Sequence, residues 1–178
     1  SLKPPLAAGA AYFGVRPLAV AFRVTSDREF VHMTLVRKGK YWYGDTREDL
    51  LEEVRRYSTR NTYVATRFAF PNCGCGGVTF KLASDEEQGA VNRTCSACGA
   101  EHLMGDSKDY ADEAEFENHL CICDGEEFEL APGVALYAES NDVRWFYVGC
   151  RCIRCNLVGV FVDYKCEAGD ADDFLREA

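Results

Sequence analysis

Eight of the ten cysteines in this chain of 178 residues fall into two copies of one pattern, and thiolates at such spacings bind metal ions. Each copy reads Cys-x-Cys-x-Gly-x-x-Phe-x-Leu-Ala and is followed by Cys-x-x-Cys. The eight cysteines are Cys73, Cys75, Cys95, Cys98, Cys121, Cys123, Cys152 and Cys155. Two thiols on one turn, a returning strand and two more thiols on a second turn build a tetrahedral four-thiolate site. We therefore predict two zinc ions (Zn²⁺) with a structural role.

Both copies also end in the same way, with Asp-x-Lys eight positions after the last cysteine. The first reads Asp106-Ser107-Lys108 and the second reads Asp163-Tyr164-Lys165. The back half of the chain is therefore an internal duplication. An acid beside a base could serve proton transfer, but opposite charges also commonly finish a turn, and we interpret the motif as the end of the last strand of each repeat.

Disulfides and iron are the alternatives to zinc for these thiols. Secreted disulfide scaffolds are usually short and use scattered spacings, whereas these thiols repeat one spacing. A bridge within Cys-x-Cys would also close a strained ring. Redox chemistry at Cys95 and Cys98 is disfavoured, because thioredoxin-like pairs open a helix and β-type sequence follows here. Zinc is favoured, and reduced thiols predict a cytoplasmic protein.

Two cysteines, Cys150 and Cys166, stand outside the repeated pattern. Their counterparts in the first copy are Arg93 and Asp109, which do not bind zinc as thiolates do. We predict that both are buried free thiols, because free cysteine packs as a small hydrophobic residue. Two substitutions at the second site stay open: Cys150 could compete with Cys152, and His119 could replace a ligand.

The chain lacks the motifs of zinc enzymes. Neither His-x-Glu nor His-Glu-x-x-His occurs. Four thiolates also leave the metal without an open coordination position and make it a poor Lewis acid. The three histidines, His32, His102 and His119, lie in predicted strands or close to a cysteine, with no nucleophile in view. We therefore predict no catalytic residues and a protein that is not an enzyme.

The elements that position the thiols are predicted to be β-hairpins. Nineteen residues separate Cys75 from Cys95 and 28 separate Cys123 from Cys152, so the second copy holds an insertion. Residues 135–138 and 143–148 are rich in β-formers, and the turn-forming cluster 139–142 joins them. Residues 157–162 form a further strand that matches residues 101–105. The second ribbon should have the longer hairpin.

Residues 1–72 are predicted to form a separate small α+β unit. Residues 18–24, 30–36, 40–43 and 62–70 have the composition of strands. A helix should begin after Asp45, which is placed to cap its first turn with Glu48 three residues later. Its buried face repeats at helical spacing and comprises Leu50, Leu51, Val54 and Tyr57.

The whole chain is predicted to be α+β and mostly β. The N-terminal α+β unit (1–72) precedes a duplicated zinc-ribbon region (73–178), which holds repeat one (73–108), an acidic linker (109–120) and repeat two (121–166). The content of 47% hydrophobic and 28% charged residues is ordinary for a soluble globular protein. No apolar run is long enough to span a membrane, and we interpret the short apolar stretch at 6–15 as mature protein.

Charge divides the chain at the same boundary. Residues 1–72 hold 12 Lys and Arg against seven Asp and Glu, and residues 73–178 hold eight against 22. The back half therefore carries a net charge of −14, and bound zinc thiolates add to it. A ribbon that grips nucleic acid must present Lys and Arg to phosphates. This half would repel them.

The acids between the repeats are either solvated surface or a docking surface for a basic protein. Exposed aromatic side chains beside them would act as binding hot spots. The predicted partner-binding residues are Asp109, Asp112, Glu113, Glu115, Glu117, Trp42 and Trp145.

The knuckle-and-hairpin pattern over residues 73–166 resembles the zinc-ribbon class, which is specific for metal but not for role. The segment 147–155, running on to Asp163-Tyr164-Lys165, resembles small bacterial proteins that accompany secreted toxins as immunity partners. Together these predict a zinc-stabilised module that binds a protein, in one form as an acidic inhibitor or immunity protein. The alternative is a nucleic-acid-associated zinc-ribbon protein that contacts phosphate through Arg16, Arg23, Arg37, Lys38 and Lys40.

Overall fold

The computed structural model describes residues 35–178. The strand predicted at 18–24, most of the one at 30–36, the stretch at 6–15, and His32, Arg16 and Arg23 lie outside the described residues. The described strands are β1 (Val36–Lys38), β2 (Tyr41–Tyr43), β3 (Arg67–Phe68), β4 (Phe80–Asp85), β5 (Ala90–Cys95), β6 (Glu101–Leu103), β7 (Glu117–Asn118), β8 (Phe128–Leu136), β9 (Val143–Cys152) and β10 (Leu157–Lys165). The helices are α1 (Arg47–Arg60), the 3-10 turn η1 (Ser107–Asp109) and α2 (Ala171–Arg176).

The fold is mostly β, and its strands join one antiparallel sheet in the order β1-β2-β10-β9-β8-β4-β5-β6. Strand β3 pairs with β8 and strand β7 pairs with β4 outside this path. The long strands β8, β9 and β10 form the centre of the sheet. Neither α1 nor α2 has the length and apolar character that a membrane-spanning helix needs.

The internal duplication is visible in the register of the sheet. In the first copy Phe80 pairs with Cys95, and in the second Phe128 pairs with Cys152. Strands β4 and β8 meet at Phe80 and Phe128, which are equivalent positions of the two copies. Antiparallel pairing of equivalent residues places a local two-fold axis between the repeats.

The predicted long hairpin of the second copy is confirmed. Strands β8 and β9 have 9 and 10 residues, against 6 each for β4 and β5. The turn between β8 and β9 is held by Ser140, whose Oγ accepts from the backbone N–H of Asp142 at 2.9 Å and donates to its carboxylate at 2.7 Å. The strands predicted after each Cys-x-x-Cys pair are also present as β6 and β10.

Helix α1 forms where the sequence predicts it, but its cap is Thr46 rather than Asp45. Thr46 has extended backbone angles, and its Oγ1 accepts from the N–H of Asp49 at 3.1 Å. The Asp49 carboxylate accepts in return from the N–H of Thr46, which completes a capping box. Asp45 instead accepts from the side chain of Asn156. The predicted apolar face is confirmed, with Leu50 and Val54 fully buried.

The described part of the expected N-terminal unit belongs to the same sheet as the ribbon region. Strand β2 pairs with β10 and strand β3 pairs with β8. Strand β3 is shorter than the predicted strand at 62–70, because preceding backbone groups bond to side chains. The carbonyl of Tyr63 accepts from the Tyr147 hydroxyl, and the N–H of Ala65 donates to Ser58 Oγ.

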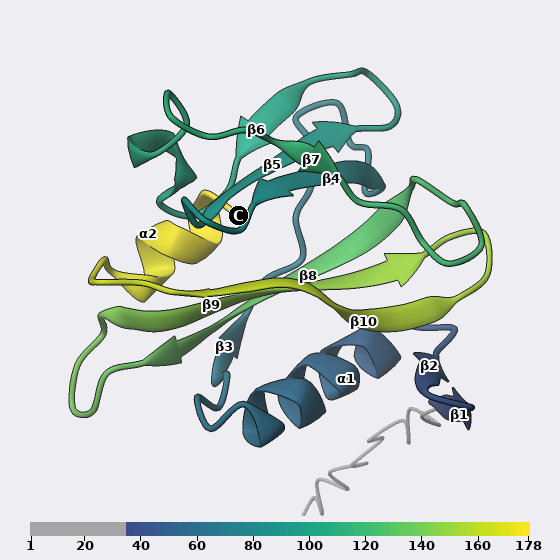
Figure 1. Cartoon of the computed structure of the whole chain (residues 1–178), viewed down its shortest axis with the longest axis horizontal. Helices are drawn as coiled ribbons and strands as arrows, with labels where there is room; N and C mark the ends of the chain where they lie inside the picture. The colour runs from purple at the N-terminus through teal and green to yellow at the C-terminus, as the bar shows by residue number, and fades with distance from the viewer. Residues whose placement is uncertain (1–34) are drawn as a thin grey trace, which may run out of the picture. The chain divides into compact units, whose positions relative to one another are not determined.

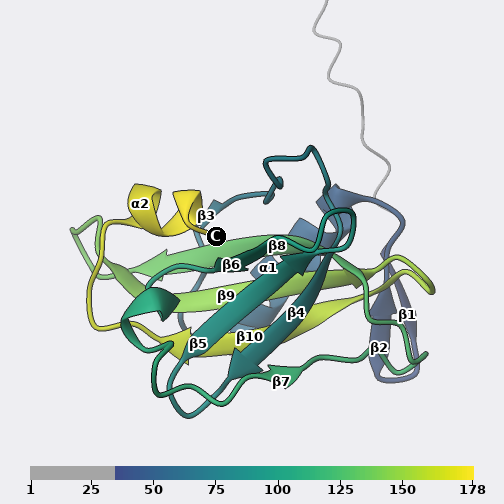
Figure 2. The same cartoon turned by 90° about the horizontal axis from the view of Figure 1, so that it is seen from above.

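Both faces of β8, β9 and β10 are covered. Figure 1 shows α1 against one face, with β4, β5 and β6 on the other, and Figure 2 shows β4 and β5 crossing over the central strands. On the α1 side, Leu50 and Val54 pack against Ala131, Tyr147 and Val158. On the opposite side one apolar cluster joins the two repeats to α2, and it includes Phe80, Leu82, Phe128, Phe146, Val148 and Phe174. The sulfurs of both cysteine groups border this second cluster.

Candidate metal centres

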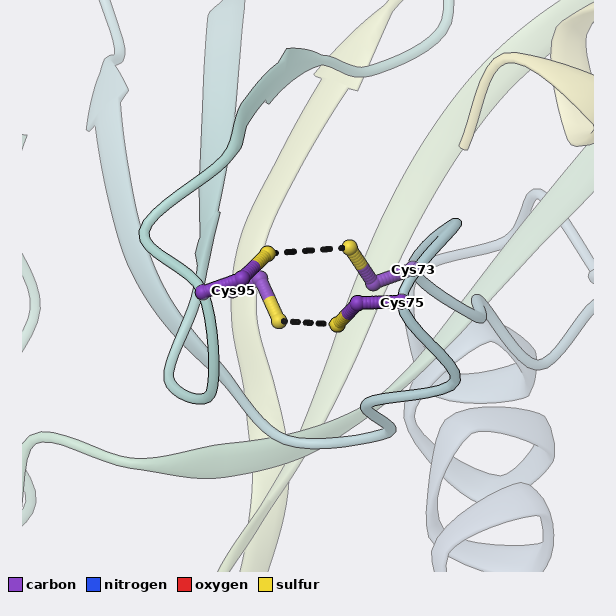
Figure 3. Close-up of side chains that lie close together, drawn as sticks. Cys73, Cys75 and Cys95 are labelled. Atoms are coloured by element: carbon purple, nitrogen blue, oxygen red, sulfur yellow. Dashed lines mark hydrogen bonds between the residues drawn. The ribbon is translucent and has the colours of Figure 1, made fainter.

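The first cysteine group lies where the chain enters β4 and leaves β5. Cys73 and Cys75 stand on the turn before β4, Cys95 ends β5, and Cys98 follows on the next turn. Figure 3 shows the sulfur atoms of Cys73, Cys75 and Cys95 turned toward the middle of the group. The sulfurs of Cys73 and Cys98 are 3.6 Å apart, and those of Cys75 and Cys95 are 3.7 Å apart. We call this group the first centre.

The second centre repeats this arrangement with Cys121, Cys123, Cys152 and Cys155. Its sulfurs lie 3.5 Å apart between Cys121 and Cys155 and 3.6 Å apart between Cys123 and Cys152. It is more enclosed than the first centre. Cys121 and Cys152 are buried, whereas the first centre exposes Cys75 and Cys98.

These separations suit a metal ion and not a disulfide. A disulfide bond is about 2.05 Å long, and all ten cysteines are free thiols. A tetrahedron with metal–sulfur bonds of about 2.3 Å has edges of roughly 3.8 Å, close to the observed sulfur separations. Within each group all four sulfurs lie within 4.8 Å of one another. Each centre could therefore hold one metal ion, as the sequence predicts.

The backbone of the turns is the same in both copies. Before β4 the N–H of Cys73 donates to the carbonyl of Gly77, and before β8 the N–H of Cys121 donates to that of Gly125, each at 2.8 Å. After β5 and β9, the matching turns close through Gly99 and Asn156, both with positive φ. Glycine and asparagine tolerate this left-handed conformation.

The glycine of the repeated motif gives the sulfurs their room. A Cβ atom placed on Gly77 would lie 2.8 Å from the sulfur of Cys95, and one on Gly125 would lie 2.9 Å from the sulfur of Cys152. Any side chain here would push a ligand out of place. The glycine occupies the same position in both copies of the motif, and this repetition is the sequence feature from which its role could be predicted.

Backbone N–H groups also point at the sulfurs and favour their ionised form. The N–H of Cys98, with that of Ala97, lowers the pKa of Cys95 to about 7. At Cys123 burial raises the pKa, but hydrogen bonds from the thiols of Cys155, Cys121 and Cys152 and from the N–H of Gly125 outweigh it and bring the pKa to about 7. Other thiols of the same centres keep their protons: bonds to neighbouring thiols outweigh the N–H of Ala100 and raise the pKa of Cys98 to about 12, and burial raises the pKa of Cys121. A metal ion displaces these shared protons, because it binds thiolates.

Cys150 and Cys166 are buried free thiols, as predicted. Neither belongs to a group that could hold a metal. Burial raises the pKa of both thiols above the usual value. Cys150 lies on β9 opposite Leu130 and its sulfur faces the apolar cluster, whereas Cys152 joins the second centre.

His119 stands apart from the second centre. Its Nε2 lies 2.7 Å from the hydroxyl of Ser84, and its ring contacts Phe161. The other described histidine, His102, bonds through Nε2 to the carbonyl of Glu177 at 2.9 Å. The four cysteines alone form the second metal-binding group among residues 35–178.

The prediction that the Asp-x-Lys motif ends the last strand of each repeat holds for the second copy, where β10 ends at Lys165, but not for the first, where the motif follows β6 and enters the turn η1. In the second copy the charges of the motif bond elsewhere. Asp163 accepts from the hydroxyl of Tyr57 at 2.6 Å and from the indole N–H of Trp145 at 3.0 Å. Lys165 pairs with Glu167 at 2.6 Å. The acid therefore ties helix α1 to the sheet and does not form a pair with the lysine of its own motif.

The predicted partner-binding residues do not form one surface. Trp42 lies under Arg56 and Trp145 stacks on Tyr63, and both belong to the apolar cluster on the α1 side. The predicted acids are exposed, and three of them, Glu113, Glu115 and Glu117, line a hollow beside β4 and β7.

This acidic hollow has a volume of about 640 Å³. Six carboxylates line it, from Asp85, Glu86, Glu87, Glu113, Glu115 and Glu117, and no lysine or arginine of residues 35–178 is among its lining residues. Burial lowers the pKa of His119, which also lines the hollow, so this ring stays neutral near pH 7. The hollow is therefore a concentrated negative site.

Sequence reasoning missed the contribution of the β4–β5 turn to this hollow. Asp85 accepts from the N–H groups of Glu87 and Gln88 in its own turn and from that of Glu115 in the linker. These bonds lower the pKa of Asp85, with the one from Glu115 contributing most. This tertiary contact brings two acidic segments together, and no local sequence pattern predicts the contact.

Comparison of the chain with protein-family models, with curated proteins and with solved structures finds no match in any of the three. The function is therefore inferred from the two centres and the surface around them.

Proposed function

We propose that the two centres bind one structural Zn²⁺ each and that the protein is a non-enzymatic module which binds another protein. The sulfur tetrahedra carry the first half of this proposal. Four thiolates favour zinc among the common metals, and they fill its coordination shell, so no position is left for water or substrate. Zinc closed in this way holds the hairpins together and has no catalytic step to perform.

The test of the zinc proposal is metal analysis of the purified chain. Wild type should contain two zinc ions per chain, and Cys98→Ser should lower this to one by opening the first centre. Cys166→Ser is the control, because it also removes one thiol, but one that belongs to neither centre. Iron in place of zinc, or loss of metal in Cys166→Ser, would contradict the assignment.

The acidic hollow supports the second half of the proposal. Its six carboxylates are near one another and are not balanced by lining cations, so a basic segment would gain both attraction and selectivity there. By contrast, the acids at the C-terminus are engaged: Asp170 caps α2, Asp172 pairs with Arg67 and Asp173 pairs with Arg176. We propose specifically that the protein acts as an inhibitor or immunity protein for a basic toxin.

Binding of a short lysine- and arginine-rich peptide, measured by fluorescence anisotropy, tests the hollow. Changing Glu86, Glu87 and Glu117 together to Gln should weaken binding about tenfold or more, since each lost charge removes on the order of 0.5 kcal/mol. The control changes Glu48, Glu101 and Glu139 to Gln, which alters the net charge equally outside the hollow. Equal loss in both variants would mean that only net charge matters.

One observation favours the alternative of nucleic-acid binding. The hairpin of β1 and β2 presents Arg37, Lys38 and Lys40, and each cation lies over an aromatic ring, of Trp42, Tyr43 and Tyr41 respectively. Such a surface could contact phosphates and bases. A gel shift with RNA or DNA that weakens steeply with salt would support this function, and absence of a shift at low salt would exclude it.

A further inference from the structure

Two polar atoms beside the first centre are buried without a hydrogen-bond partner among the described residues. They are Nε of Arg93 and Oγ of Ser96, which stand on either side of Cys95. Buried donors normally have partners, because an unsatisfied one costs free energy of about 1–3 kcal/mol. Arg93 is the one of the two that carries a charge, and it stands two residues before the ligand Cys95 on the same strand.

Arg93 is the more unusual of the two, because it is a charged side chain that is only 7% exposed. It lies on β5 opposite Leu82 and on the same face as Cys95, and its guanidinium sits 4.6 Å from the centre of the Phe80 ring. No carboxylate of residues 35–178 forms an ion pair with it. A lone buried charge is strongly unfavourable, so a compensating negative group is required.

The thiolates of the first centre supply that negative charge. Burial lowers the pKa of Arg93, and the charges of Cys73 and Cys95 act against this effect. A zinc ion with four thiolates carries a net formal charge of about −2, spread over sulfurs that accept hydrogen bonds. Protonated thiols, by contrast, offer Arg93 no charge and only weak acceptors.

The second centre is built without these groups. The positions equivalent to Arg93 and Ser96 hold Cys150 and Ile153, a buried thiol and an exposed apolar side chain. Arg151 pairs with Glu129 at 2.6 Å, whereas Arg154 stands on the turn of the second centre, is exposed, and donates to the carbonyl of Cys123 at 2.9 Å. The duplicated centres therefore differ in the burial of the nearby cation although their ligands are identical.

We infer that Arg93 is the counter-charge of the first metal centre. Arg93 reduces the formal charge of that centre to about −1 in a buried setting, whereas the cation at the second centre, Arg154, is exposed to solvent. Arg93 is a positioning residue that acts through the ligands. This inference rests on the proposed binding of zinc. It assigns different electrostatic support to the two copies, so the loss of one arginine should affect one centre only.

Competition for zinc with a chromogenic chelator tests the inference. Arg93→Met keeps much of the apolar packing on Phe80 but removes the charge, and it should weaken zinc binding at the first centre about 10–100-fold. The second centre should be unchanged; its release step is identified from Cys98→Ser, which keeps only that centre. Arg93→Lys restores the charge and should recover most of the affinity. Arg176→Met removes an exposed arginine as the control.

The absorption spectrum of the cobalt-substituted protein provides a second measurement, which a change in packing alone would not alter. Loss of the positive charge raises the energy of the sulfur electrons, so the thiolate-to-cobalt absorption of Arg93→Met should shift to longer wavelength, and Arg93→Lys should reverse the shift. Unchanged affinity and spectrum in Arg93→Met would overturn the inference. Failure of Arg93→Lys to rescue would overturn it as well, by assigning Arg93 a packing role. Wild type without bound zinc would instead refute the proposed function.

Discussion

At the scale of single residues, the glycine of the repeated motif matters as much as the cysteines beside it. Gly77 is needed because a Cβ would meet the sulfur of Cys95, not because of its backbone angles. Gly74 lies in the same turn, yet a Cβ added there meets nothing within 4 Å. Substitutions at the two glycines can therefore distinguish crowding of a ligand from a general effect on the turn.

Gly77→Ala should weaken zinc binding at the first centre by about tenfold or more, because the added methyl displaces the ligand from its tetrahedral position. Gly74→Ala should bind zinc as wild type does. Chelator competition on the two variants measures the difference. Equal affinities would show that the turn relaxes to make room.

Tyr57 makes stability depend on alkaline pH. Burial and the bond to Asp163 raise its pKa from the usual 10.0 to about 12. Because only the protonated hydroxyl donates, its contribution is fully present below pH 10 and is lost as pH rises from 10 toward 12.

Wild type should therefore lose more stability than Tyr57→Phe over this alkaline range. The difference should be on the order of 1 kcal/mol, reduced because the side chain is only partly buried. Urea unfolding near neutral pH and at about pH 11 measures it. Tyr147 titrates in both proteins and cancels, so parallel pH profiles would contradict the role of the bond to Asp163.

Among the secondary-structure elements, α1 begins where it does because one side chain, that of Thr46, caps its first turn. The sequence offers Asp45 with Glu48 and Thr46 with Asp49 as equally spaced pairs. The chain uses the second pair, and Asp45 is left to bond Asn156 on the turn of the second centre. The cap thereby fixes the helix next to a metal-binding turn.

Thr46→Ala should destabilise the protein by about 1 kcal/mol, since it removes the acceptor for the N–H of Asp49. Asp45→Ala should cost less, because Asp45 is exposed and does not cap the helix. Thermal unfolding of both variants distinguishes them. A larger loss of stability in Asp45→Ala would show that Asp45 is the capping residue, as the sequence predicts.

At the scale of the whole molecule, the two centres support different parts of the fold. Strands β9 and β10 carry or adjoin Cys152 and Cys155, and they also contact α1 and β2. Strands β4 and β5, beside the first centre, cover the opposite face. Loss of metal binding at the second centre should therefore destabilise α1, whereas loss of metal binding at the first centre should not.

Hydrogen exchange measures this difference. In Cys155→Ser the amides of α1 should lose protection, and in Cys98→Ser they should keep most of it while those of β4 and β5 exchange faster. Far-ultraviolet circular dichroism checks that each variant is folded. Equal loss of α1 protection in both variants would show that the sheet unfolds as one cooperative unit.

Residue types and spacing were enough to predict the two cysteine groups, the free thiols Cys150 and Cys166, the longer second hairpin and the apolar face of α1. These follow from spacing along a short stretch of chain, which local geometry converts directly into position. The contacts between distant segments emerge only in the folded chain. There β2 and β3 join the ribbon strands, Trp42 and Trp145 are partly buried on the apolar cluster of the α1 side, and Asp85 lies beside Glu115. The acidic hollow and the unpaired Arg93 depend on such contacts, because charge and burial become meaningful only when the neighbours are known.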